Sequence, residues 1–467
     1  MEREKIQAIV ERVLSRIDAG EMPAASSAPT SPNGVFKNVS DAVAAATTSH
    51  QILVAVPLEK RREIIANIRR RCAENVNTLA TMAHEETGLG RVADKIKKNL
   101  LVIHKTPGCE ILEPKAWTGD SGLSLVERAP FGVIGSITPC TNPSETIICN
   151  GIGMIAGGNA VVFNTHPLAK GTSAYTVDLV NRASMEVGGP NNLLCCIETP
   201  TIASANELMK FPGVRMIVVT GGGEVVKAAM NSGKICIAAG PGNPPVVVDE
   251  TADIEAAAAG ITAGCSFDNN VICTDEKEVF VVESVADRFI EAMRDNGCVQ
   301  LRNHQITRLE KLIMMPDGVH VNKKWVGRDA SKMLKAIDVP FSGDPRLIIC
   351  DVPFDHPFIQ HELLMPVLGI TRVRDVNEGI DFAVKAEHGY GHTASMWSKN
   401  IDALHRMARV INCSIFIKNA PNYAGLGYGG EGYTSFTIAS PTGHGLTTAV
   451  DFTRVRRCTL AGYFRIV

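Results

Sequence analysis

Thirteen cysteines are the most reactive side chains that the sequence offers, and their spacing limits what they can do. No C-x-x-C pair or other metal-ligand spacing occurs, so no metal site is predicted. A cysteine thiolate is a nucleophile that attacks carbonyl carbons. With a usual pKa of about 8.5, however, most cysteine side chains are protonated thiols at neutral pH. We expect most of these residues to be small buried hydrophobes and one or two to be chemically active. A catalytic cysteine then requires either a lowered thiol pKa or a neighbouring base.

Glycine-rich segments are the second feature with chemical meaning. Residues 220–224, TGGGE, follow a predicted strand and open a predicted helix, where backbone N–H groups can meet a phosphate. Residues 151–156 and 425–430 also fit a dinucleotide-binding glycine pattern. The first lies inside a predicted helix, and no parallel strand–helix unit surrounds the second, so both are rejected as dinucleotide fingerprints.

The elements that must position these residues alternate along the chain. Residues 36–115 are mostly helical in pattern, and from Gly132 short β-rich runs alternate with helical segments such as 144–155 and 171–187. This alternation predicts a doubly wound, mostly parallel α/β sheet, whose ligands bind at the carboxyl ends of its strands. Ligand contacts are therefore expected first in the loops after Thr138, Asn164 and Thr220. A second α/β region extends from about residue 245 to 422.

Both ends of the chain have distinct patterns. Residues 1–20 form a predicted amphipathic helix, followed by a linker over residues 21–34 that is rich in Pro, Ala, Ser and Thr. The helix either docks on its own domain or is an address peptide that binds another protein, and its periodicity fits both. The last stretch, residues 453–467, is strand-like and could pair with another subunit or domain.

Composition excludes several classes of function. The 467 residues carry a net charge of −2, which gives no general attraction to nucleic acid or anionic membrane. The longest apolar runs are far too short to span a bilayer, and the charged N-terminus does not resemble a secretory signal. Together with the odd number of cysteines, this predicts a reducing, cytoplasmic location.

Three segments, in order, resemble the aldehyde dehydrogenase superfamily: ITPCTNP (137–143), FDNNVICTDEKEV (267–279) and HELLMPVLG (361–369). More narrowly, residues 238–253, 413–419 and 429–445 resemble the coenzyme A-acylating propionaldehyde and acetaldehyde dehydrogenases of bacterial microcompartments. The resemblance implies an NAD-binding domain over 35–119 and 131–240 and a catalytic domain over 241–423. It also implies oligomerisation strands over 120–130 and 446–467, and an encapsulation-type peptide over 1–20.

The resemblance assigns roles to individual residues. Cys273 matches the nucleophile that forms a thioester with the substrate, while Cys265 is expected to be a packing residue. Asn142 matches the asparagine whose amide stabilises the oxyanion, although by itself an Asn before Pro also fits a turn. The expected cofactor-binding residues are Thr138, Pro139, Asn164, His166, Thr220, Gly221, Gly222, Ala239 and Glu362, with Glu362 on the nicotinamide ribose.

Two departures from the superfamily are informative. Hydrolytic members carry a water-activating glutamate about thirty-four residues before the nucleophile, where this chain has Ala239. Without that carboxylate the acyl group needs another acceptor, and the thiol of coenzyme A attacks a thioester without so strong a base. Asn164 stands where many members have a lysine, which removes a cation for a 2′-phosphate and favours NAD over NADP.

The sequence thus predicts NAD-dependent conversion of a short aldehyde, propionaldehyde first and acetaldehyde next, to an acyl-coenzyme A. Alternatives are a hydrolytic dehydrogenase that releases the acid, a phosphorylating dehydrogenase, and a non-catalytic microcompartment protein. The phosphorylating class is disfavoured because Cys273 is followed by Thr-Asp-Glu rather than Thr-Thr-Asn. A homodimer or homotetramer inside a microcompartment is expected, with shell proteins as partners of residues 1–20.

Overall fold

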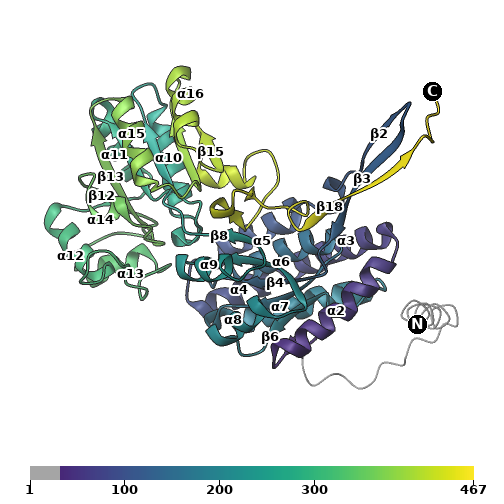
Figure 1. The fold of residues 1–467 in the computed structure, drawn as a ribbon. Coiled ribbons are helices and arrows are strands. Elements are labelled where there is room, and N and C mark those ends of the chain that lie inside the picture. The colour runs from purple at the N-terminus through teal and green to yellow at the C-terminus, as the bar shows by residue number, and fades with distance from the viewer. Residues whose placement is uncertain (1–31) are drawn as a thin grey trace.

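A computed structural model describes residues 32–467, which form two α/β lobes and a projecting arm (Figure 1). The predicted helix at 1–20 and most of the linker at 21–34 lie outside the described residues. None of the described helices is long and apolar enough to cross a membrane.

The first lobe is built on a six-stranded sheet in which every pairing is parallel, in the order β1-β6-β5-β4-β7-β8. Its strands are β1 (Val35–Phe36), β4 (Val133–Ile137), β5 (Ala160–Asn164), β6 (Leu194–Ile197), β7 (Val214–Thr220) and β8 (Ile235–Ala239). β4, β5 and β6 are buried throughout, as expected for strands with both faces covered. Successive residues of β4 enter different cores: Val133 packs on one face of the sheet and Ile134 on the other.

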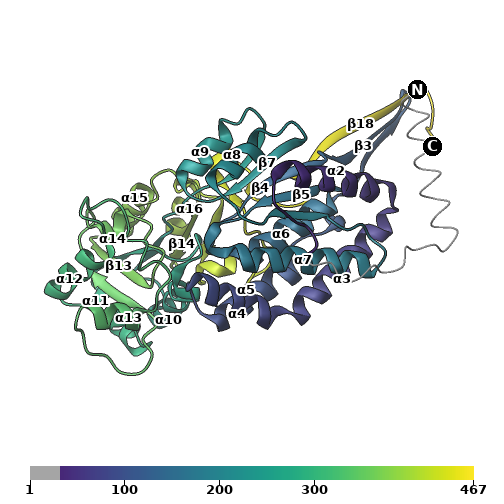
Figure 2. The same cartoon turned by 90° about the horizontal axis from the view of Figure 1, so that it is seen from below.

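Helices cover both faces of this sheet (Figures 1 and 2). They are α2 (Val39–Ala55), α3 (Leu58–Glu74), α4 (Val76–Thr87), α5 (Val92–Lys105), α6 (Pro143–Ala156), α7 (Lys170–Glu186), α8 (Ile202–Lys210) and α9 (Gly223–Met230). α6 and α7 agree with the predicted helical segments, and the pattern at 151–156 lies inside α6, so it is not a strand-to-helix turn. β7 ends at Thr220 and α9 begins at Gly223, as predicted for the TGGGE segment.

The second lobe holds a seven-stranded sheet in the order β11-β12-β13-β10-β9-β14-β15, again all parallel. Its strands are β9 (Pro245–Val248), β10 (Glu278–Val282), β11 (Val299–Gln300), β12 (Ile348–Asp351), β13 (Val367–Val373), β14 (Thr393–Trp397) and β15 (Ile415–Lys418). Its helices are α10 (Ile254–Cys265), α11 (Glu283–Asp295), α12 (Asn303–Ile313), α13 (Ala330–Ala336), α14 (Pro357–Gln360), α15 (Val376–Ala386) and α16 (Ile401–Val410). The fold is the predicted doubly wound α/β architecture with a second α/β domain.

A three-stranded antiparallel sheet forms the arm, which projects from the first lobe with the C-terminus near its tip (Figures 1 and 2). It consists of β2 (Lys115–Gly119), β3 (Gly122–Pro130) and β18 (Thr453–Ala461). The C-terminal strand therefore pairs with β3 of its own chain. The arm sheet begins at residue 115 rather than 120, and Gly445–Leu446 pairs instead with Ile438–Ala439 near the lobes.

Candidate active site

A cavity of about 190 Å³ lies between the two lobes and collects most of the expected site residues. Strand ends of the first lobe supply Pro139, Thr141, Asn142, Thr220, Gly221, Gly222, Gly240 and Pro241; the second lobe supplies Val271, Ile272, Cys273, Glu362 and Leu364; and the C-terminal segment supplies Leu426, Ser435, Phe436 and Ile438. Three larger clefts lie elsewhere in residues 32–467: one beside residues 300–304, one between α5 and residues 427–431, and one on the arm sheet. The first two are lined by no cysteine, and the third has the exposed Cys458 but no side-chain amide beside it. The interlobe cavity is therefore the site with nucleophilic chemistry.

Cys273 reaches the cavity at the end of a sharply turned loop. Asp268, Asn269 and Asn270 in the short helix η3 (Phe267–Asn270) have φ values of 47°, 56° and 62°, a left-handed run that Asp and Asn tolerate better than most side chains. Lys277 then closes the loop, since its Nζ donates to Asn270 Oδ1 (2.6 Å) and to the backbone oxygen of Ile272 (3.0 Å). The nucleophile is thus held on both sides by buried polar contacts.

Cys265, by contrast, is fully buried at the end of α10, as expected for a packing residue. Asn270 Nδ2 donates to its Sγ at 3.4 Å and to its backbone oxygen at 2.8 Å. Burial raises the pKa of the Cys265 thiol well above its usual range, with a further contribution from Glu276. Such a thiol is unsuited to nucleophilic attack.

The environment of Cys273 decides between the two conditions set for a catalytic cysteine. Burial, assisted by the charge of Glu362, raises the pKa of the Cys273 thiol to about 12. The condition of a lowered thiol pKa is therefore not met, and the requirement for a base remains. Burial also raises the pKa of Glu362 to about 7, against the opposing effects of Lys277 and a hydrogen bond from the backbone of Gly242. A carboxyl group with that pKa exchanges protons readily at neutral pH.

Asn142 lies at the junction of β4 and α6, immediately before Pro143 at the first helical position. Its side chain makes no capping bond to the helix; instead its Oδ1 accepts a hydrogen bond from Lys98 Nζ at 2.6 Å. Its Nδ2 donates to Thr141 Oγ1 at 3.2 Å, which occupies one of two N–H groups. Asn142 is therefore both a turn residue and a candidate oxyanion donor, because the turn between β4 and α6 presents its carboxamide to the cavity.

The cofactor-binding predictions divide into two groups. Pro139, Thr220, Gly221, Gly222 and Glu362 line the cavity. A Cβ built on Gly222 would meet open space, as would one on the following Gly223, so the backbone at the start of α9 is accessible to a large ligand.

The residues of the second group are absent from the cavity lining. Thr138 is buried, and its Oγ1 has no protein partner, which leaves a hydroxyl free for a ligand. Ala239 ends β8, and its backbone oxygen accepts from Gly221 N–H. Asn164 and His166 are engaged locally: Asn164 Oδ1 accepts from Ser204 Oγ (2.6 Å), and His166 Nδ1 accepts from Leu168 N–H (3.2 Å). Ligand contacts from these two side chains would require those bonds to be given up.

Several ionisable residues around the site were not anticipated from the sequence. Lys95 and Lys98 on α5 are fully buried, although a lysine on an amphipathic helix usually lies in solvent. Lys323, in a loop of the second lobe, lies near enough to His166 and Cys140 to affect the pKa of both. His392 is also buried beside Gly242, with an unpartnered Nε2, and burial lowers its pKa to about 3. These residues are far from Cys273 and Asn142 along the chain, and no motif in the sequence links them to the site.

A thiol, a carboxamide and a carboxyl group lie together between the two lobes, beside an open glycine loop, and this arrangement is typical of an enzyme with a cysteine nucleophile. The model of the aldehyde dehydrogenase family matches residues 26–300 and 345–450, which is most of the chain. The chain belongs to the aldehyde dehydrogenase family.

Individual members of the family are similar to this chain over nearly its whole length. Acetaldehyde dehydrogenase (acetylating) EutE of Escherichia coli (strain K12) is 46% identical over 472 residues, covering 100% of both chains. A propionaldehyde dehydrogenase from the Clostridium phytofermentans fucose utilisation bacterial microcompartment has a TM-score of 0.92 at 46% identity, covering 93% of this chain and 100% of that one. Rhodopseudomonas palustris propionaldehyde dehydrogenase, solved with bound CoA and an acylated cysteine, has a TM-score of 0.90 at 45% identity, covering 92% and 98%.

Proposed function

We propose that this protein oxidises a short-chain aldehyde with NAD⁺ and transfers the acyl group to coenzyme A. One observation carries the proposal: Cys273 and Asn142 line one cavity, while the position of the water-activating glutamate is occupied by Ala239 at the end of β8. Among the cavity-lining residues within 32–467, Glu362 is the one carboxylate. The arrangement supports formation of a thioester and lacks the usual group for its hydrolysis.

The reaction sequence follows from the side chains in the cavity. The Cys273 thiol loses its proton, for which Glu362 is the proposed acceptor, and the sulfur attacks the aldehyde carbon. The resulting oxyanion is stabilised by Asn142 Nδ2 and the backbone N–H of Cys273. NAD⁺, held by the glycine loop and the other residues proposed to bind it, would accept a hydride from that carbon as the C=O bond re-forms, which would leave a thioester on Cys273. The coenzyme A thiol would then lose its proton to solvent and its sulfur would attack the thioester carbon, which breaks the bond from that carbon to Cys273 and releases Cys273 as thiolate.

Cofactor choice rests on the loop at 164–167, which has no Arg or Lys to pair with a 2′-phosphate; we therefore propose that NAD⁺ is preferred over NADP⁺. Burial lowers the pKa of His166, and the positive charge of Lys323 lowers it further, so Lys323 is the cation to test near this loop. Lys323→Ala is expected to leave the specificity constant for NAD⁺ within about threefold of wild type and to weaken any residual use of NADP⁺. Comparable specificity constants for the two cofactors in the wild type would reject the preference.

Assembly and location belong to the same proposal. The arm sheet is exposed along β2 and β18, and we propose that a second copy of the chain covers these edge strands in a dimer or tetramer. Residues 1–20 are proposed to bind microcompartment shell proteins and so place the enzyme inside such a compartment in the cytoplasm. Sedimentation of the full chain tests the first statement, and recruitment of a fluorescent protein fused to residues 1–20 tests the second.

The acyl acceptor provides the decisive experiment. Enzyme, NAD⁺ and propionaldehyde without coenzyme A are expected to give a burst of about one NADH per active site, followed by slow turnover. Coenzyme A should restore rapid cycling with acyl-coenzyme A and NADH formed one to one, and Cys273→Ala should show neither phase. Steady production of free acid without coenzyme A, at a rate close to that with it, would reject the acylating function in favour of hydrolysis. Aldehydes of two to four carbons then define the substrate range, since one methylene changes discrimination by only about 1–3 kcal/mol.

A further inference from the structure

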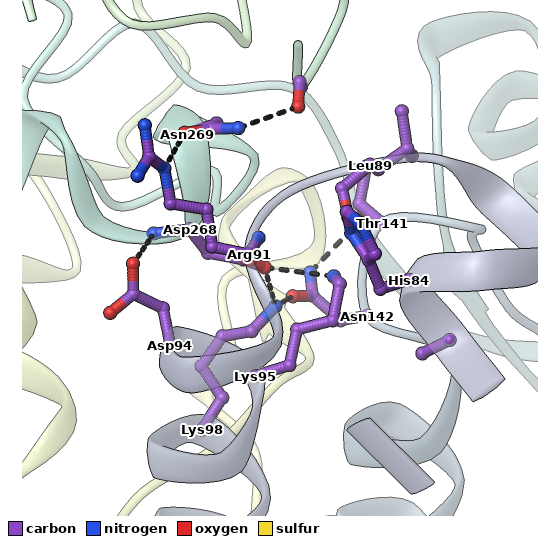
Figure 3. A network of polar contacts seen from close by, with 12 residues as sticks. His84, Leu89, Arg91, Asp94, Lys95, Lys98, Thr141, Asn142, Asp268 and Asn269 are labelled. Atoms are coloured by element: carbon purple, nitrogen blue, oxygen red, sulfur yellow. Dashed lines mark hydrogen bonds and ion pairs between the residues drawn. The ribbon is translucent and has the colours of Figure 1, made fainter. Parts of the chain in front are cut away.

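A cluster of buried charges lies next to the oxyanion residue and joins the two lobes (Figure 3). It contains Lys95 and Lys98 from α5, Glu145 from α6 and Asp268 from η3. All four side chains are fully buried. Burial of this many charges is costly, so each must be held by specific partners.

Lys98 is the member of the cluster that touches the site. Its Nζ donates a hydrogen bond to Asn142 Oδ1 at 2.6 Å and forms an ion pair with Asp268 Oδ2 at 2.5 Å (Figure 3). A longer ion pair, of 3.4 Å, joins it to Glu145 Oε1. Burial by itself lowers the pKa of Lys98, but Asp268 and Glu145 outweigh it and raise that pKa above its usual range. Lys98 is therefore a protonated donor held between two carboxylates and the Asn142 oxygen.

Asp268, the principal partner of Lys98, is itself fixed in place. Arg91 N–H donates to its Oδ1 at 2.7 Å, and Lys95 Nζ donates to its Oδ2 at 3.0 Å. Gly90, at φ +67°, approaches the Asp268 carboxylate so closely that an added Cβ would lie 1.9 Å from Oδ1. Because Asp268 cannot shift easily, the ammonium of Lys98 has a fixed position relative to the loop that carries Cys273.

We propose that Lys98 is a positioning residue that fixes the orientation of the Asn142 carboxamide, directing Nδ2 toward the oxyanion formed at Cys273. An ammonium group has only donors, so the atom that faces it must be the amide oxygen. A flipped amide would place its NH₂ against Nζ and its oxygen against the developing negative charge, which is unfavourable at both ends. The charge on Nζ also polarises the amide and strengthens its free N–H as a donor.

Lys95 provides a matched control, because it donates to the same Asp268 oxygen and is equally buried but does not contact Asn142. Lys98→Met is expected to slow the NADH burst by about 30- to 1,000-fold, approaching the loss of an oxyanion donor. Lys95→Met should destabilise the protein similarly but change the burst rate by less than about fivefold. Equal effects of the two substitutions on the burst rate would overturn the proposal.

A double-substitution cycle separates positioning from general structural damage. In the Asn142→Ala background Lys98→Met has no amide to orient, so it should slow the burst by no more than about threefold further. Losses that multiply instead would overturn the proposal. The inference rests on the role proposed for Asn142, and the cycle distinguishes the two failures. A fast Asn142→Ala enzyme rejects that role, whereas a slow Asn142→Ala with a fast Lys98→Met rejects the inference alone.

A measurement without any change at Lys98 covers the case in which its variants do not fold. Asn142→Asp keeps an oxygen against Nζ, whereas the apolar, similarly sized Asn142→Leu leaves one N–H of the ammonium unpaired. The melting temperature of Asn142→Asp should therefore equal or exceed that of wild type, and Asn142→Leu should melt lower by several degrees. The reverse order of the two variants would show that Lys98 does not bond Oδ1.

Discussion

The reactivity of the resting nucleophile is open to direct measurement. A thiol with a pKa of about 12 is thiolate in roughly one molecule in 100,000 at pH 7, whereas an ordinary cysteine with a pKa of about 8.5 is thiolate in about 3%. The thiolate of higher pKa is intrinsically more nucleophilic, which offsets about 40-fold of this difference. Iodoacetamide should therefore alkylate Cys273 of the cofactor-free enzyme on the order of 100-fold more slowly than an ordinary thiol.

The pH profile of this alkylation is the diagnostic. A raised pKa predicts a rate that climbs about tenfold per pH unit from pH 7 to 10 without a plateau. Peptide mapping by mass spectrometry identifies the alkylated residue among the thirteen cysteines, with Cys273→Ala as the blank and the exposed Cys458 as an internal reference for the reagent.

Glu362 supplies the matched perturbation. Because its charge helps to raise the thiol pKa, Glu362→Gln should speed alkylation of Cys273 at pH 8 while slowing turnover, since the proposed proton acceptor is lost. A plateau between pH 6 and 7 in the wild type would show a lowered thiol pKa and refute this reasoning. Faster turnover of Glu362→Gln would remove its assignment as the base.

Further outcomes follow from the remaining parts of the structure. Cys273→Ala should abolish acyl-coenzyme A formation, and Cys265→Ala should keep most activity because Cys265 lies in the core; equal losses in the two variants would contradict the assignment. Burial raises the pKa of Glu276 in the folded protein to about 8, whereas the unfolded chain releases this proton above about pH 4.5. The free energy of unfolding therefore falls as the pH rises from about 4.5 to about 8. Urea unfolding should show that Glu276→Gln lacks this fall, which amounts to at most about 5 kcal/mol in the free energy of unfolding between pH 4 and 9. Parallel curves of unfolding free energy against pH for the two proteins would disprove it. Deletion of residues 1–20 should leave solution kinetics unchanged, and a large loss of activity or melting temperature would favour docking on the parent domain.

Local patterns were sufficient for the architecture. Short runs of β-branched and apolar residues alternate with helical segments, and each such run became a parallel strand. β4, β5 and β6 are buried throughout, because burial on both faces accommodates runs of this kind, whereas β7 and β8 each keep an exposed residue. The same reasoning located the glycine loop between β7 and α9, since that segment lies between elements whose ends the sequence marks. The arm was anticipated as strands but not as a sheet beginning at Lys115, because β2 is short, exposed and without a buried face.

The sequence by itself determined the doubly wound fold, and the resemblance of its motifs to those of aldehyde dehydrogenases gave the candidate nucleophile Cys273 and carboxamide Asn142. Only the tertiary structure decided the electrostatics. It placed Lys98 against Asn142, forty-four residues away, and left Asn164 engaged with Ser204. It also raised the thiol pKa of Cys273 rather than lowering it. Burial and charge pairing depend on contacts between distant segments, and a pattern of neighbouring residues does not encode those contacts.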